Sequence, residues 1–294
     1  MKNGVLDIDH MMISVKNSQR AGETFERLGF TLTPRSALPG MSNRLICFPP
    51  TEPDRCNFVE LLGFDDRAAA PAFMHDLLGD REGPVSMVMA SRDARAAEQE
   101  LRANGFDLYP ARAFKRDWTL PSGEVISPEF VVCLLKPGES PLYWNIAQYV
   151  GDTPRHYHRP DFTMHPNTAC AFTAVLAVAD DPAAIARHYE QVWDGRVLQL
   201  PQGVVGVTLN RVTLRLMTPA QAAALYPGAP LPARKGGAAY LGVAIGFERL
   251  DVARAHVERA GVAHKPLAEG GLWLPPEVAH GCVVAYEEPW RDKM

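Results

Sequence analysis

Residues 9–15, DHMMISV, begin the segment that decides the fold. They form an apolar run of strand length, and a helical pattern follows that ends at Gly29, a typical helix stop. The apolar face of this predicted helix consists of Ala21, Phe25 and Leu28. Further apolar runs at residues 30–32, 44–48 and 57–62 predict three more strands. The order of elements is therefore β-α-β-β-β.

The same order recurs three times along the chain, which indicates an internal repeat. Each copy has a short strand, a helix that stops near a glycine, and further apolar runs. The helices of these copies are predicted at residues 94–104, 182–193 and 250–260. Four βαβββ modules predict an α+β protein. Between the second and third copies, polar residues and prolines without periodicity are typical of a linker.

Composition excludes several functions. The chain has 294 residues, 47% hydrophobic and 22% charged, as expected for a globular protein of about two domains. A net charge of −4 gives no basic surplus for nucleic acid or an anionic membrane, and no apolar run is long enough to span a bilayer. Residues 1–9 lack a signal-peptide layout, and the five scattered cysteines suit a reducing cytoplasm. Nucleotide-binding loops are absent from the sequence, so we expect no nucleotide cofactor.

Four segments resemble the vicinal oxygen chelate superfamily, and within it the glyoxalase-like group. They are IDHMMISV, FERLGFTLTPRSALPGMSNRLICF, NFVELLGF and MHPNTACAFTAVLAVADDP. The resemblance implies modules paired two by two into half-open cups, with domains over residues 5–152 and 167–289 and a linker over 153–166. This superfamily includes isomerases, lyases, dioxygenases, epimerases and antibiotic-binding proteins, so the fold alone does not give the reaction.

The resemblance also implies a metal site in the first cup, where ligands come from the first and last strands of each module. Alignment of the modules gives the cluster His10, Glu60, Ser86 and Gln148. Imidazole, carboxylate and amide oxygen are workable ligands, whereas a serine hydroxyl is a rare one. We therefore expect a weakly bound Zn²⁺, Ni²⁺, Mn²⁺ or Fe²⁺ at His10, Glu60 and Gln148.

Glu60 is the strongest candidate from the residues alone. Alternation along its apolar strand places Glu60 on the same face as Phe58. A buried carboxylate is costly unless it is paired or used. His10, Arg44 and Arg116 are its candidate partners.

The other predicted cup positions are mostly apolar, as in small-molecule sites. Alternation places Met12 beside His10 and Trp144 beside Gln148, and Arg116 at the rim suits an anionic ligand. The predicted ligand-contacting residues are Met12, Asn43, Phe58, Ser86, Arg116, Trp144 and Gln148. The alternative is that these side chains only pack a core.

In the second domain the same alignment gives Thr173, Arg215, Gly242 and Ala285, which do not form a metal cluster. We therefore expect this domain to be degenerate for metal. It would pack against the first domain or form a homodimer surface.

Two functions remain open. The first is an enzyme of the lyase or isomerase kind, in which the divalent ion binds vicinal oxygens of a small substrate and Glu60 and His10 are catalytic. Glu60 could instead be a general base. The second is a metal-free protein that binds a metabolite or antibiotic in the same cup.

Overall fold

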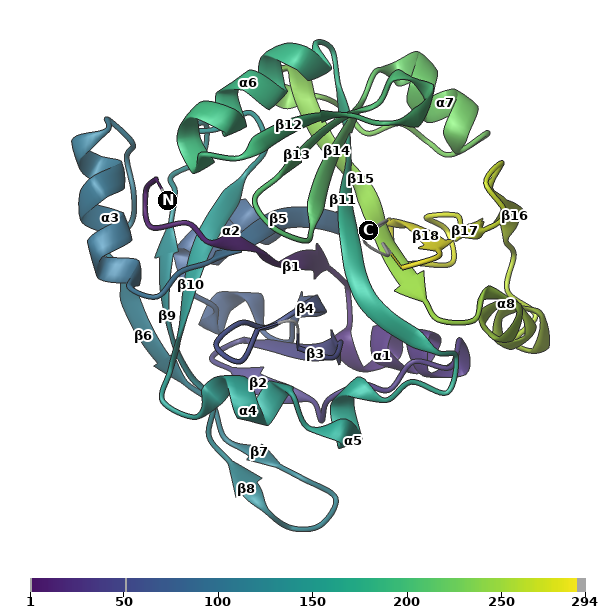
Figure 1. Ribbon diagram of the computed structural model, residues 1–294. Helices are drawn as coiled ribbons and strands as arrows, with labels where there is room; N and C mark the ends of the chain where they lie inside the picture. The colour runs from purple at the N-terminus through teal and green to yellow at the C-terminus, as the bar shows by residue number, and fades with distance from the viewer. Residues whose placement is uncertain (1, 51, 290–294) are drawn as a thin grey trace.

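The computed structural model describes residues 2–50 and 52–289, and contains two eight-stranded sheets flanked by helices (Figure 1). Each sheet holds two of the predicted modules side by side. The predicted α+β fold, with four repeated modules paired two by two, is therefore confirmed. Among the described residues, none of the helices is both long enough and apolar enough to cross a bilayer.

The first sheet is built around two antiparallel central strands, β1 and β5. Met12 lies opposite Ser86 and His10 lies opposite Val88, so an approximate two-fold axis relates the strands. Strand β4 runs parallel to β1, and β10 runs parallel to β5. The order across the sheet is β2 (Ser36–Leu38), β3 (Met41–Cys47), β4 (Phe58–Phe64), β1 (Asp7–Ser14), β5 (Gly83–Ala90), β10 (Trp144–Val150), β9 (Glu129–Leu134) and β6 (Arg112–Lys115).

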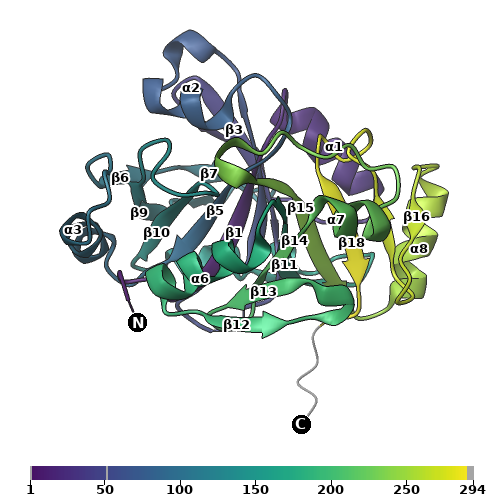
Figure 2. The same cartoon turned by 90° about the horizontal axis from the view of Figure 1, so that it is seen from above.

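The second sheet repeats this arrangement with β11 and β15 at its centre, and lies beside the first sheet (Figure 2). Strands β14 and β18 run parallel to these two central strands. The order is β12 (Arg196–Gln199), β13 (Val205–Thr208), β14 (Thr213–Met217), β11 (Ala169–Ala179), β15 (Ala238–Phe247), β18 (Val283–Glu287), β17 (Leu272–Leu274) and β16 (Lys265–Pro266).

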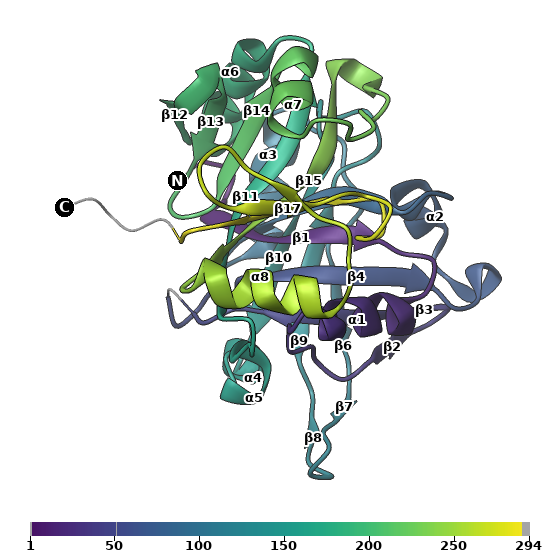
Figure 3. The same cartoon turned by 90° about the vertical axis from the view of Figure 1, so that its right-hand side faces the viewer.

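One helix from each module packs on the outer face of a sheet. These are α1 (Ser18–Arg27), α3 (Ala94–Ala103), α6 (Pro182–Trp193) and α8 (Leu250–Arg259). The side chain of Asn17 caps α1 by accepting the N–H of Arg20. Gly29 follows the helix with a φ of 84°, which favours glycine. A Cβ at Gly29 would collide with His256, because α8 packs closely against the end of α1 (Figure 3).

One apolar core joins the two sheets. It includes Met11 and Met87 from the first sheet, and Val175 and Val243 from the second. Because side chains alternate along a strand, the residues between these, such as Met12, face the concave side of their sheet. Each central strand therefore has one face in the shared core and one face in a cup.

Two local predictions need correction. Residues 30–32 are not a strand, and the next strand is β2. The proline at position 34 has no N–H, so it cannot donate a hydrogen bond to a neighbouring strand. The residue before it, Thr33, is hydrogen-bonded to Leu45 of β3, but this pairing does not continue into a strand. Residues 65–82, for which the sequence predicts no element, contain a 3₁₀ turn at Arg67–Ala69 and the helix α2 (Ala72–Leu78).

The predicted linker over 153–166 is folded against the first sheet (Figure 1). It forms α4 (Thr153–Tyr157) and α5 (Pro160–Thr163). Tyr157 and Phe162 make edge-on contacts with Trp118. Trp118 belongs to a small hairpin of β7 (Trp118–Thr119) and β8 (Val125–Ile126), which projects beyond the body of the protein (Figure 3).

His165 fixes the end of this connection. Its Nδ1 accepts the N–H of Thr31 at 2.9 Å, and its Nε2 donates to the carbonyl oxygen of Cys47 at 2.9 Å. Both ring nitrogens are therefore satisfied only in the neutral form. Burial lowers the pKa of His165 to about 4.

This histidine predicts a loss of stability in acid. Because its folded-state pKa of about 4 lies below the ordinary 6.5, the unfolded chain binds the proton first. The contribution of the neutral His165 ring to the free energy of unfolding is complete above pH 6.5. It is lost as the pH falls towards 4, and the loss amounts to about 3 kcal/mol. Urea unfolding at neutral and at acidic pH measures this loss. The free energy of unfolding should fall less in acid for His165→Asn than for the native chain. Burial raises the pKa of Asp7 to about 6, but this opposite effect cancels because both chains share it. An equal acid loss in both chains would contradict the assignment.

Candidate functional site

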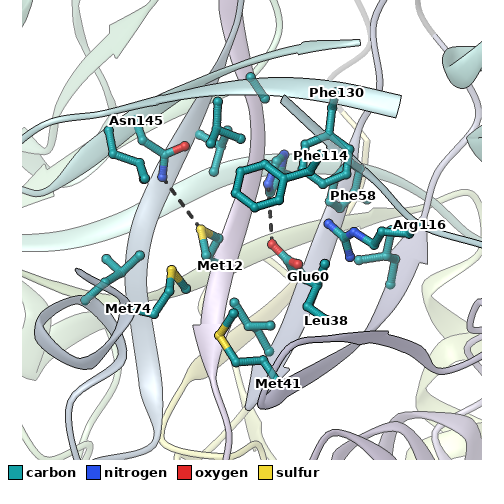
Figure 4. Close-up of a pocket in the computed structure, with 18 of the residues that line it drawn as sticks. Met12, Leu38, Met41, Phe58, Glu60, Met74, Phe114, Arg116, Phe130 and Asn145 are labelled. Atoms are coloured by element: carbon teal, nitrogen blue, oxygen red, sulfur yellow. Dashed lines mark hydrogen bonds and ion pairs between the residues drawn. The ribbon is translucent and has the colours of Figure 1, made fainter. Parts of the chain in front are cut away.

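The concave face of the first sheet encloses a cavity of about 100 Å³, far more than a single water needs (Figure 4). Most of its lining is apolar, and the polar groups are few. The apolar side chains include Met12, Leu38, Met41, Leu45, Phe58, Leu62, Phe73, Met74, Leu77, Val88, Phe114, Phe130 and Ala147. The polar or ionisable ones are His10, Glu60, Arg116, Asn145, Tyr149 and Tyr157. Such a composition is typical of small-molecule sites.

Two segments outside the central strands cover the cup. Helix α2 contributes Phe73 and Met74, and the chain at the end of β6 contributes Phe114 and Arg116. The guanidinium of Arg112 lies 5.3 Å from the ring centroid of Phe73, so the two covering segments touch each other. The cavity is thus covered on one side by α2, which lies between the first two modules, and on the other by the edge strand of the second module.

His10 is held on the floor of the cup by three contacts. Its Nδ1 donates to Asp9 Oδ1 at 2.7 Å, and its ring stacks on Phe58 with the centroids 4.0 Å apart. Its Nε2 lies 3.6 Å from Glu60 Oε2, too far for a direct hydrogen bond. Burial alone would lower the pKa of His10, but Asp9 and Glu60 outweigh it and the pKa lies above its ordinary value. The two carboxylates therefore favour the imidazolium.

Glu60 is buried beside His10, as predicted from its apolar strand. Its Oε1 accepts a short hydrogen bond from Asn43 Nδ2. Burial alone would raise the pKa of Glu60, but His10, Arg116 and Asn43 outweigh burial, and the pKa lies below its ordinary value. Glu60 is therefore a carboxylate, and the predicted partner Arg44 is used elsewhere, by Glu26 and the Thr33 carbonyl.

Arg116 lies at the same polar wall (Figure 4). Its guanidinium carbon is 4.6 Å from the ring centroid of Phe130. Its Nε and Nη1 are buried and have no hydrogen-bond acceptor among the residues that the structure describes. Buried donors of this kind are costly, so the guanidinium is a group with unused binding capacity.

The predicted positions of Trp144 and Gln148 in the cup are wrong. Gln148 Oε1 accepts the N–H of Ala94 at 3.0 Å on the helix side of the sheet. Trp144 is fully buried in the shared core, with its ring 5.7 Å from Trp193. On β10 it is Asn145, Ala147 and Tyr149 that line the cavity.

The error arises from the module alignment. Glu60 is paired with Met12, and the two-fold equivalent of that pair is Asn145 with Val88. Asn145, rather than Gln148, therefore corresponds to Glu60. A shift of three residues is odd, and an odd shift moves every side chain to the opposite face of a strand.

Ser86 does correspond to His10, as predicted, but it lies behind the cavity lining. It is fully buried, and its hydroxyl accepts a hydrogen bond from Asn145 Nδ2 at 2.9 Å. The second module thus places a neutral Ser86–Asn145 pair where the first module has His10 and Glu60. Met12 and Phe58 line the cavity, and Asn43 lies behind Glu60.

Sequence reasoning missed the roles of Asp9 and Tyr149. Asp9 lies at a register shift between β1 and β5, where a bulge re-aims its side chain. Its Oδ1 accepts hydrogen bonds from both His10 and the Tyr149 hydroxyl, the latter at 2.6 Å. The sequence carries no recognisable signal for this bulge, and Tyr149 was hidden by the register error.

The residues of the cup do not fit a divalent metal of the expected kind. His10 and Glu60 supply two donors, but Gln148 faces away and the equivalent Ser86–Asn145 pair is hydrogen-bonded to itself. Within the described ranges, His, Cys, Asp and Glu side chains form no group of three that could hold a metal. Catalytic metals of this type use three protein ligands. The two remaining donors, His10 and Glu60, are one fewer than such a site needs.

The second cup uses its polar groups differently. Arg215, at the strand position that corresponds to Glu60, makes two hydrogen bonds of 2.7 Å to Glu287. The Thr173 hydroxyl donates to the same carboxylate at 2.7 Å. Ala285 shares an apolar cluster with Trp273 and with Tyr226, which follows α7 (Pro219–Leu225). Two charged groups of this cup, Arg215 and Glu287, therefore satisfy each other, and Thr173 joins them.

Comparisons with known proteins agree with this fold. The family model described as a glyoxalase-like domain matches residues 8–193, more than half of the chain. No curated protein matches the chain in sequence. A hypothetical protein from Staphylococcus aureus has a TM-score of 0.65 at 10% identity, covering 95% of this chain and 98% of its own. A methylmalonyl-CoA epimerase from Streptomyces coelicolor has a TM-score of 0.38 at 16% identity, covering 50% of this chain and 99% of its own. The similarity to the Staphylococcus aureus protein shows a shared fold and nothing about function.

The donor set makes a prediction about metals. Protein purified without chelator should retain no stoichiometric Zn²⁺, Ni²⁺, Mn²⁺ or Fe²⁺, because two donors hold a divalent ion weakly. In contrast, the double variant Ser86→His/Asn145→Glu should bind Zn²⁺ or Ni²⁺, since it completes the two-fold-related ligand set. Elemental analysis after gel filtration measures both. About one ion per native chain, lost in Glu60→Gln, would overturn our interpretation of this site.

Proposed function

This chain belongs to the glyoxalase-like domain family, and from that premise we propose that its first cup binds a small organic molecule without a metal. The ligand has an apolar body and one oxygen-bearing end. The observation that carries the proposal is the one-sided polarity of the cavity. His10, Glu60 and Arg116 share one wall (Figure 4), whereas aliphatic, methionine and phenylalanine side chains make up most of the rest.

The volume and the lining define the ligand further. A cavity of about 100 Å³ suits a single ring or a short branched chain rather than a nucleotide. Flexible methionines such as Met12, Met41 and Met74 can adapt to irregular shapes. The hydrogen on His10 Nε2 has no close acceptor, because Glu60 is 3.6 Å away. A ligand oxygen at that point would receive a charge-assisted hydrogen bond.

Binding should be detectable by titration calorimetry with a panel of single-ring and short branched ketones, acids and amides, in the presence of EDTA. We expect at least one class to bind the native chain and to raise its melting temperature. Val88→Phe, which fills the cavity, should abolish binding. Val125→Phe is the matched control, because Val125 is 58% exposed on the β7–β8 hairpin. The proposal fails if no member binds, or if Val88→Phe binds as well as the native chain.

The Asp9–His10–Glu60 contacts favour a second function at the same site, the transfer of a proton next to a carbonyl group. The His10 imidazolium would donate a hydrogen bond to the carbonyl oxygen. The Glu60 carboxylate would remove a proton from the neighbouring carbon, leaving an enolate whose negative charge faces His10. Return of a proton from Glu60 to the same carbon restores the carbonyl compound, and the hydrogen is exchanged when the Glu60 carboxyl has traded its proton with solvent before that return.

The resting geometry is compatible with this step. Glu60 is a weak base while His10 stabilises its charge. A ligand oxygen that takes the His10 hydrogen bond removes part of this stabilisation, and burial then favours uptake of a proton by Glu60. Asp9 is a positioning residue, since it holds Nδ1 and so directs Nε2 towards the cavity.

Deuterium exchange measured by NMR tests the proton transfer on ketones and 2-oxo acids that bind. The native chain should exchange the hydrogen next to the carbonyl, and Glu60→Gln should slow this by about a hundredfold or more. Exchange should fall as the pH rises through the pKa of His10. Because Asp9 raises that pKa, Asp9→Asn should move the fall to lower pH. Binding without exchange in the native chain would leave the site as a binding site only.

A further inference from the structure

We propose that the ligand of the first cup is a short apolar or aromatic monocarboxylate, and that Arg116 binds its carboxylate. This inference rests on the proposed binding function and names the class of ligand. The guanidinium is aimed at the wall that contains Glu60, from the loop that follows β6 in the second module (Figure 4).

The first argument is the hydrogen bonding of Arg116. Arginine has five N–H donors in a planar fork and accepts nothing. Two of its three nitrogens, Nε and Nη1, are buried without an acceptor among the described residues. The arginines that the fold uses structurally are different, since Arg215 makes two 2.7 Å bonds to Glu287 and Arg44 reaches Glu26 and Thr33. An acceptor supplied by a ligand would satisfy the donors of Arg116.

The second argument is orientation. The backbone N–H of Arg116 donates to the carbonyl of Pro128, and its guanidinium lies over the ring of Phe130. These contacts fix the arginine without using its buried donors. A planar guanidinium held in this way is pre-organised for a planar carboxylate. The rings of Phe114 and Phe130 are close by, 5.7 Å apart and nearly parallel, and can contact the apolar body of the ligand.

The third argument is charge. Arg116 and a charged His10 provide two positive charges, while Glu60 lines the same wall and Asp9 lies behind it. A carboxylate carries one negative charge. A dianionic phosphate would meet about twice the repulsion from Glu60 and Asp9, with few further donors to offset it. The site therefore favours a single negative charge.

The test uses matched sets of ligands with identical carbon skeletons, each prepared as the acid, the primary amide and the phosphonate. Arylacetates and short branched alkanoates are suitable skeletons. Calorimetry in EDTA should show that the native chain prefers the acid over its amide by roughly ten- to a hundredfold. Arg116→Gln should remove this preference, so that acid and amide bind alike.

Lys115→Gln is the matched control for loss of a positive charge. Lys115 is the neighbouring residue, is exposed and pairs with Glu129, so its loss should leave the preference unchanged. Melting temperatures of the variants distinguish binding from structure, because an arginine with unpaired buried donors contributes little to stability. A large drop for Arg116→Gln would assign it a structural role and overturn the proposal.

The outcomes separate this inference from the proposed function. Equal binding of acid and amide by the native chain, or tighter binding of the phosphonate, overturns the carboxylate assignment and leaves the binding function intact. If no skeleton binds in any of its three forms, the binding function itself fails, and the assignment of Arg116 fails with it.

Discussion

Strand β1 is buried on both faces from Asp7 to Ser14, and the arrangement of the site depends on this burial. Met11 and Ile13 face the core shared with the second sheet, whereas His10 and Met12 face the cup. A polar group on such a strand cannot reach bulk water, so it must find its partners inside the protein. His10 meets this condition through a hydrogen bond to Asp9 and, at 3.6 Å, through the charge of Glu60. Each of these carboxylates has a further side-chain donor, Tyr149 for Asp9 and Asn43 for Glu60.

The approximate two-fold symmetry of the first sheet is preserved in the backbone and broken in the charges. Equivalent positions hold His10 and Ser86, and Glu60 and Asn145. One module therefore supplies ionisable groups and the other a neutral hydrogen-bonded pair. In the second sheet the position equivalent to Glu60 holds Arg215. Arg215 makes two hydrogen bonds to Glu287, one to each carboxylate oxygen. His10 Nε2 and Glu60 Oε2 are 3.6 Å apart, so His10 can donate a hydrogen bond to a ligand and Glu60 can accept one. Arg215 and Glu287 of the second cup are already hydrogen-bonded to each other.

The sequence predicts the repeat well because alternation and helix periodicity are local signals. The cup face of β1 and β4 follows from Glu60 alone, since one charged residue in an apolar strand fixes the register of its neighbours. The prediction for β10 rests on matching residues 60–63 to residues 148–151. That match is shifted by three residues, so it selects Gln148 in place of Asn145. Asp9 reaches His10 through a bulge, and α2 covers the cup from an irregular segment. Neither feature is encoded by periodicity.

The charges of the cup also determine how a ligand is oriented. A divalent ion would bring two positive charges to Glu60 and would direct binding towards oxygen pairs. Here the positive charges are on His10 and Arg116, which are attached to different segments and approach the wall from different directions. The hydrogen bonds available to a ligand therefore lie at two separated points of one wall. The opposite walls present mainly methyl, thioether and ring surfaces, which gain most from contact with an apolar body. A molecule with oxygen at one end satisfies both requirements in a single orientation, and a molecule with oxygens at both ends would bury an unsatisfied acceptor.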